Sequence, residues 1–257
     1  MNYKAIYFSA TDTSKTGAVS IAKALAGAAA IEEIDLTPYA AADREITLGA
    51  NDFAVFSAPV YNGRIPLLAM QRFSKVKGNG TSCIVTVTYG NRDYDDALLE
   101  LADWAVASGF KVQAAAALIG QHTFGEIQVG RPNADDVKEN EKFVRDFLGA
   151  VNGNLKRDGV KLAIKGERPY RGEGKGGGFR PLTGDNCVHC GLCQRECPAG
   201  AIADDFKTLS DNCISCFRCI RVCPVQAKNM DEPKYRDWAA GFTQRLAPRR
   251  ENEYFLG

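Results

Sequence analysis

The sequence predicts an α/β domain with a doubly wound, five-stranded parallel sheet, followed by a small cysteine-rich α+β domain. Three observations lead to this prediction. Strand and helix signals alternate over about the first 150 residues. Glycine and basic side chains then dominate residues 166–180. Two cysteine runs of identical spacing follow, offset by 26 positions.

The strands are predicted from short apolar runs, and the helices from apolar side chains at helical spacing. The expected strands are residues 3–8, 31–36, 53–58, 83–88 and 112–119; the second is the weakest, and Pro59 ends the third. The expected helices are the alanine-rich residues 16–28, residues 67–73 after Pro66, residues 94–107 and the amphipathic residues 133–151. Alternation of this kind is typical of a doubly wound parallel sheet, whose ligands bind at the carboxyl ends of the strands.

Composition limits the function classes. The 257 residues allow one large or two smaller domains. A net charge of +1 gives no argument for nucleic acid, and no apolar run is long enough to span a bilayer. Without an export signal, the cysteines are expected to be reduced, which favours the cytoplasm.

The two cysteine runs carry the most specific signal. Each reads C-x-x-C-x-x-C-x-x-x-C-P, at residues 187–198 and 213–224. This is the bacterial ferredoxin run for 4Fe–4S clusters, so two clusters are expected. Zinc sites instead use paired C-x-x-C units, and disulfides suit short secreted chains. In two-cluster ferredoxins the fourth cysteine of each run ligates the other cluster. One cluster is therefore assigned to Cys187, Cys190, Cys193 and Cys223, and the other to Cys213, Cys216, Cys219 and Cys197.

The remaining features set the domain boundaries. We expect a first domain at residues 1–163, a flexible basic linker at 164–180, the cluster domain at 181–230 and a tail at 231–257. The apolar positions of the tail fit one helix face, expected to pack on the body. Cys83, the ninth cysteine, lies in an apolar strand and is expected to be an inert buried thiol.

Three polar loops follow the first, third and fourth predicted strands, where a ligand is expected. They are residues 9–16, 58–64 and 88–94. In the first, hydroxyls and backbone N–H groups at a helix start can bind a phosphate. Each loop alone also fits a solvated turn, and serine or threonine often only caps a helix. The absence of G-x-G-x-x-G after the first strand disfavours a dinucleotide site.

These loops resemble those of flavodoxins. Thr11, Thr13 and Thr16 fit the T-x-T-G-x-T phosphate loop, although Ser14 stands in place of its glycine. The third loop is similar to the G-D-x-x-Y pattern, and the resemblance implies that Tyr94 stacks on the flavin. The FMN contacts that the resemblance implies are Ser9, Thr11, Thr13, Ser14, Lys15, Thr16, Pro59, Val60, Tyr61, Asn62, Gly63, Thr88, Tyr89, Gly90, Asn91 and Tyr94, with Tyr61 and Tyr89 as second aromatic contacts.

The whole chain then resembles the flavodoxin-domain-containing ferredoxin fusions of anaerobic microbes. The resemblance implies a cytoplasmic electron-transfer iron–sulfur flavoprotein that binds FMN and two 4Fe–4S clusters. Its partner would be a redox protein or a small-molecule electron donor or acceptor. Two alternatives stay open: a ferredoxin-linked FMN reductase acting on a quinone or nitro compound, and a redox sensor. No catalytic acid–base pair is visible; His122 is either a flavin contact or a loop cap, and His189 either tunes a cluster or is simply exposed.

Overall fold

The computed structural model describes all residues, 1–257, and its first domain is built on a six-stranded sheet. Five strands are parallel: β1 (Asn2–Tyr7), β2 (Ile31–Asp35), β4 (Asp52–Pro59), β6 (Thr81–Tyr89) and β7 (Phe110–Ile119). They lie in the order β2-β1-β4-β6-β7. This is the doubly wound order of flavodoxin, with the order reversing beside β1. The five predicted strands and the predicted fold class are confirmed.

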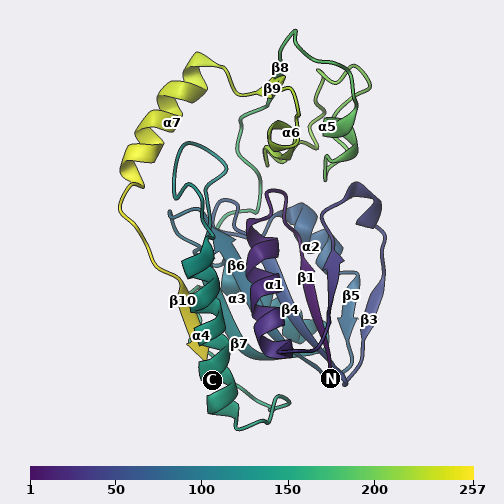
Figure 1. Cartoon of the computed structure of the whole chain (residues 1–257), viewed down its shortest axis with the longest axis vertical. Coiled ribbons are helices and arrows are strands. Elements are labelled where there is room, and N and C mark those ends of the chain that lie inside the picture. Colours follow the sequence, from purple (N-terminus) through teal and green to yellow (C-terminus); the bar gives the residue numbers. More distant parts are fainter.

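Helices cover both faces of this sheet (Figure 1). Helices α1 (Thr13–Ala26) and α4 (Ala134–Val151) pack on one face, against Phe53 and Val55 of β4. Helices α2 (Leu67–Phe73) and α3 (Ala97–Ala107) pack on the other, against Ala54 and Phe56. Successive side chains of a strand point to opposite faces, so one apolar strand serves both layers. The four predicted helices are therefore confirmed, with ends that differ by a few residues.

Several short elements are not predicted by the sequence. A 3-10 turn, η1 (Tyr39–Ala41), precedes β3 (Ile46–Leu48), which pairs with β5 (Val76–Gly78). The tail forms α7 (Pro233–Arg245) as expected and then returns as β10 (Glu253–Leu256), antiparallel to β7. In Figure 1 this last strand lies at the sheet edge beside α4, far from α7. The tail thus has a helical half and a strand half.

The cluster domain lies beyond the carboxyl ends of the parallel strands (Figure 1). It holds two one-turn helices, α5 (Leu192–Arg195) and α6 (Arg218–Arg221), one in each cysteine run. Strands β8 (Leu182–Thr183) and β9 (Lys228–Asn229) pair antiparallel and join its two ends. The cluster domain therefore faces the edge at which doubly wound sheets bind ligands.

The linker contacts the first domain along much of its length. It forms no helix or strand, but its backbone is held at several points. The backbone N–H groups of Glu167 and Arg171 donate to Asp96, and the Gly174 carbonyl accepts from Leu67 N at 3.1 Å. The side chain of Arg168 forms a two-pronged ion pair with Asp103. The basic linker is thus ordered against acidic side chains of the first domain.

Two arginines join the domains directly. Arg72 of α2 is buried, and its guanidinium donates to the Pro198 carbonyl beside Cys197 at 2.5 Å. Arg218 of α6 donates to the Ala10 carbonyl at 3.0 Å. The cluster domain is therefore fixed against the first strand loop. None of the helices has the length and apolar character needed to cross a membrane.

Candidate flavin and cluster sites

A cavity of about 460 Å³ lies at the carboxyl edge of the sheet. The sheet loops form its floor, and the linker, the cluster domain and α7 supply the other walls. The predicted contacts that line it are Ser9, Thr11, Thr13, Ser14, Pro59, Val60, Tyr61, Asn62, Thr88, Tyr89 and Gly90. The three polar loops therefore meet in one space, whose volume is within the usual range for small-molecule and cofactor sites.

Five predicted contacts lie outside this cavity. Lys15 extends to Glu33, at 3.4 Å, and the Thr16 hydroxyl donates to the Asp12 carbonyl. Gly63 has a φ of +79° and shapes the turn, where a Cβ would lie 2.3 Å from Asp95.

Asn91 and Tyr94 contact the C-terminal tail instead. The Asn91 amide donates to the carbonyls of Leu246 and Pro248 and accepts from Arg250 N. Tyr94 is fully buried, its ring packs edge-on against Tyr89, and its hydroxyl donates to Glu253 at 2.7 Å. In this structure Tyr94 is not among the residues that line the cavity, and its hydroxyl is bound to Glu253 of β10.

The first loop offers unused hydrogen-bond donors to the cavity. The backbone N–H groups of residues 10–14 have no acceptor within the protein. Asp12 adopts a left-handed conformation, with φ of 63°, and this geometry turns successive N–H groups toward one point. The buried Ser14 hydroxyl also lacks a partner, whereas the Ser9 hydroxyl is occupied because it accepts from Lys15 N. The loop thus fits a phosphate at the start of α1.

Other cavity residues are not predicted as contacts by the sequence. They come from the first and third polar loops, the loop after β7, the linker, the second cysteine run and α7: Ala10, Arg92, Gln121, Thr123, Phe124, Lys175, Gly176, Gly177, Ser215, Trp238 and Phe242. Trp238 and Phe242 stack with ring centroids 4.6 Å apart. The sequence shows that Trp238 and Phe242 share one helix face, but it does not show which surface this face contacts.

His122 also lines the cavity. Burial lowers the pKa of its imidazole to about 4, so it is neutral near pH 7. Its Nδ1 lies 2.8 Å from Phe124 N and 3.0 Å from the Phe124 carbonyl oxygen, so the ring is held by the backbone of its own loop. His122 thus caps this loop and also borders the large cavity.

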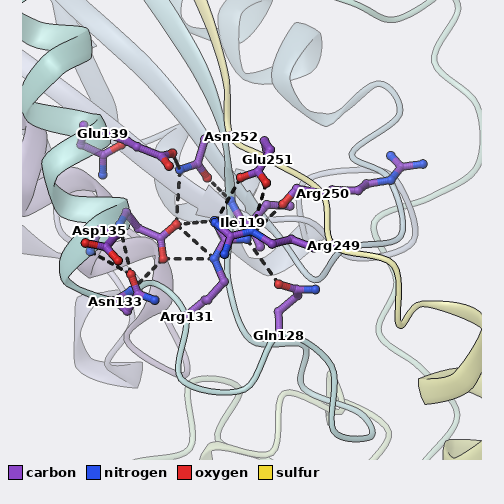
Figure 2. Close-up of polar contacts among 12 residues, drawn as sticks. Ile119, Gln128, Arg131, Asn133, Asp135, Glu139, Arg249, Arg250, Glu251 and Asn252 are labelled. Carbon is purple, nitrogen blue, oxygen red and sulfur yellow. Dashed lines mark hydrogen bonds and ion pairs between the residues drawn. The ribbon is translucent and has the colours of Figure 1, made fainter.

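The C-terminal segment is anchored beside this site by a polar network (Figure 2). The Asn252 side chain accepts from Ile119 N at 2.7 Å and donates to Glu139 at 2.6 Å. Arg131, paired with Asp136, donates to the Arg250 carbonyl at 3.0 Å. This network ties the segment after α7 to the end of β7 and the start of α4.

The eight cysteines of the two runs divide between two smaller cavities. One is lined by Cys187, Cys190, Cys193 and Cys223, and the other by Cys197, Cys213, Cys216 and Cys219. Each set thus contains three cysteines of one run and the last cysteine of the other. No three metal-binding side chains converge closely enough for a single ion. A cubane spreads its four thiolates more widely, so the arrangement fits clusters better than zinc.

The cysteines of the second cavity are the more buried. Cys197, Cys216 and Cys219 are buried, whereas Cys190 of the first cavity is exposed. Burial raises the pKa of Cys216 and of Cys219 to about 12. Backbone N–H groups approach one sulfur in each cavity, Ala201 N at Cys197 Sγ (3.3 Å) and Ala227 N at Cys223 Sγ (3.1 Å). Such N–H···S bonds are among the factors that tune cluster potentials.

The second cluster cavity adjoins the large cavity. Ser215 lines the large cavity, while its neighbours Ile214 and Cys216 line the cluster cavity. Phe217 lines the cluster cavity and packs edge-on against Phe124 of the large cavity, with centroids 5.0 Å apart. One short backbone segment and one aromatic pair thus form a shared wall.

Cys83 is fully buried, as expected, and burial raises the pKa of its thiol. His189 is exposed and packs against Phe206.

Comparison with known proteins matches residues 182–224 to the 4Fe-4S dicluster domain family. Comparison with curated sequences gives no match. Among solved structures, a flavodoxin from the domain Archaea is 15% identical with a TM-score of 0.40, and the match covers 59% of this chain and 99% of that one. Oxidised flavodoxin 2 from Bacillus cereus is 13% identical, with a TM-score of 0.43 and coverage of 58% and 99%.

Rubredoxin oxygen:oxidoreductase from Desulfovibrio gigas is 12% identical with a TM-score of 0.41 over 61% of this chain, and this chain spans only 37% of its length. At such similarity the strand order β2-β1-β4-β6-β7 carries the fold assignment, and the family match carries that of the cluster domain. The chain is therefore a fusion of a flavodoxin-like domain with a 4Fe–4S dicluster domain.

Proposed function

We propose that this chain is an electron-transfer flavoprotein that holds FMN and two 4Fe–4S clusters and passes electrons between them. The observation that carries the proposal is the wall shared by the large cavity and the second cluster cavity. Ser215 faces one cavity and Cys216 the other, and the Phe124–Phe217 contact spans the same boundary. A protein that transfers electrons internally needs its centres close and fixed, and this wall meets that need.

The residues of the large cavity suit FMN. The free N–H groups of residues 10–14 and the unpaired Ser14 hydroxyl would hold its phosphate. Arg92 and Lys175 line the same cavity, each in an ion pair, with Asp95 and Glu173 respectively. Tyr61, Tyr89 and Trp238 supply aromatic walls for the ring system in place of Tyr94. When bound, FMN accepts or donates one or two electrons, which links one-electron centres to two-electron acceptors.

The cysteine sets suit one cluster each. Cys187, Cys190, Cys193 and Cys223 would hold the first, and Cys197, Cys213, Cys216 and Cys219 the second. Eight reduced thiols require a reducing compartment, which supports a cytoplasmic location.

The two cluster sites differ in how exposed they are to solvent. Cys190 is exposed, and the adjacent Val188 is 61% exposed, so an outside redox partner can approach the first site. The second site is buried and borders the candidate flavin cavity. The arrangement supports a route from an external carrier through the first and then the second site to the flavin cavity.

Metal analysis and spectroscopy of anaerobically prepared protein test the composition. We expect about eight irons and about eight sulfides per chain, as two cubanes require, together with FMN released on denaturation. Replacement Cys197→Ala should damage the cluster held by Cys213, Cys216 and Cys219. Damage in EPR spectra to the cluster held by Cys187, Cys190 and Cys193 would instead mean that each run closes its own cluster. Iron for one cluster only would overturn the proposal.

A further inference from the structure

The two halves of the cluster domain differ sharply at one equivalent position. The repeat offset of 26 residues aligns Cys197-Pro198-Ala199-Gly200-Ala201-Ile202 with Cys223-Pro224-Val225-Gln226-Ala227-Lys228. Ile202 is buried among apolar side chains. At the matching position the second half buries a lysine, which is only 2% exposed.

The Lys228 ammonium has no partner in the protein. Its Nζ is buried without a hydrogen bond, and no carboxylate forms an ion pair with it. Burying an unpaired charge costs several kcal/mol, so it persists only where the surroundings supply opposite charge. The Asp205 carboxylate accepts from Thr208 and from the Lys207 backbone N–H, and it forms no ion pair with Lys228.

Lys228 borders the site assigned to the first cluster. Lys228 lines the cavity of Cys187, Cys190, Cys193 and Cys223. A 4Fe–4S cluster with four thiolate ligands carries a net negative charge, and a further electron increases it.

We propose that Lys228 is the buried counter-charge of the cluster held by Cys187, Cys190, Cys193 and Cys223, and that it raises the reduction potential of this cluster. This inference rests on the proposed function, since it requires the clusters to be bound. An added electron is stabilised by a nearby positive charge, and net charge and burial are among the determinants of cluster potentials. Because Ile202 occupies the matching position in the first repeat, only the second repeat of the cluster domain has this buried charge.

Potentiometric EPR titration of the anaerobic holoprotein tests the inference. Replacement Lys228→Met keeps the length of the side chain and removes its charge, whereas Lys228→Arg keeps the charge. Ile202→Met is the matched control in the other half. Iron is counted first in every protein.

In Lys228→Met we expect the reduction potential of the cluster bound by Cys193 to fall. The shift should reach at least tenfold in the reduction equilibrium, about 59 mV for one electron. Lys228→Arg and Ile202→Met should stay near the wild type, and the flavin potential should not change.

Unchanged cluster potentials in Lys228→Met with full iron would overturn the inference and leave the electron-transfer proposal intact. If Lys228→Met loses iron, Lys228→Gln is measured with it. Loss from both neutral variants but not from Lys228→Arg supports the counter-charge. Loss of iron from all three variants would mean that Lys228 has a packing role, and it would overturn the inference. A wild type without two clusters would instead refute the proposed function itself.

Discussion

Gly176 of the linker lies directly against Ile214 of the second cysteine run. A Cβ added at Gly176 would lie 1.9 Å from the Ile214 carbonyl oxygen, closer than any real contact. Gly176 also lines the large cavity, and Ile214 lines the second cluster cavity. The absence of a side chain at Gly176 therefore sets how closely the two sites approach.

Replacement Gly176→Ala should push the linker away from the cluster domain. Overpacking of this kind costs about 1–3 kcal/mol, and we expect a lower Tm and weaker FMN binding. Gly178→Ala is the matched control, because a Cβ there meets nothing within 4 Å. Thermal melts and flavin titrations of the two variants check this. Equal behaviour of the two would contradict the close approach.

Tyr94 is expected to act in stability and not in flavin binding. Tyr94→Phe removes the hydrogen bond to the Glu253 carboxylate at 2.7 Å. Hydrogen bonds to charged groups contribute about 1.5–3 kcal/mol, so the free energy of unfolding should fall by roughly that amount. FMN affinity, measured by fluorescence titration, should stay within about twofold of the wild type, which corresponds to less than about 0.4 kcal/mol of binding free energy. A tenfold loss of affinity would restore Tyr94 to the flavin site.

The phosphate loop can be tested by charge. Thr11 lines the large cavity, so Thr11→Asp places a carboxylate beside the proposed phosphate. We expect FMN affinity to fall at least tenfold, about 1.4 kcal/mol, while riboflavin binding changes little. Thr11→Asn, of the same shape without the charge, is the control. If wild-type protein binds FMN and riboflavin equally well, the phosphate is not held at this loop.

His122 should make stability depend on pH. Burial lowers the pKa of the folded imidazole from 6.5 to about 4, so the folded state binds fewer protons than the unfolded state between these values. The part of the free energy of unfolding that depends on a neutral His122 is fully present above about pH 6.5 and is lost as the pH falls toward about 4. His122→Asn should therefore lose less stability than the wild type over this range. Parallel curves of Tm against pH would exclude this role.

The sequence predicts the features that local patterns encode. The five parallel strands follow from apolar runs such as residues 83–88, because a buried strand must be apolar on both faces. The division of the eight cysteines into two sets follows from the spacing of the runs. β10 escapes prediction because four residues pair with the free edge of β7, which no local pattern reveals.

The sequence is least informative where distant segments meet. Tyr94 matches a flavin-stacking pattern, but its partner Glu253 lies 159 positions away in the sequence. The glycines of the linker suggested flexibility, whereas Gly174 and Gly176 allow the chain to pass close to the Ile65 and Ile214 carbonyls. The composition shows that the linker is rich in glycine, but only the fold shows which close backbone contacts these glycines allow.

The central claim is that clusters and flavin exchange electrons within one chain, and stopped-flow kinetics test it most directly. An outside one-electron donor reduces the clusters of anaerobic holoprotein, and flavin absorbance is followed at several protein concentrations. We expect flavin reduction at a rate independent of protein concentration. A variant with both cluster sites removed by Cys→Ser replacements should keep FMN but reduce it far more slowly. A rate that rises linearly with protein concentration would show transfer between molecules and contradict the account.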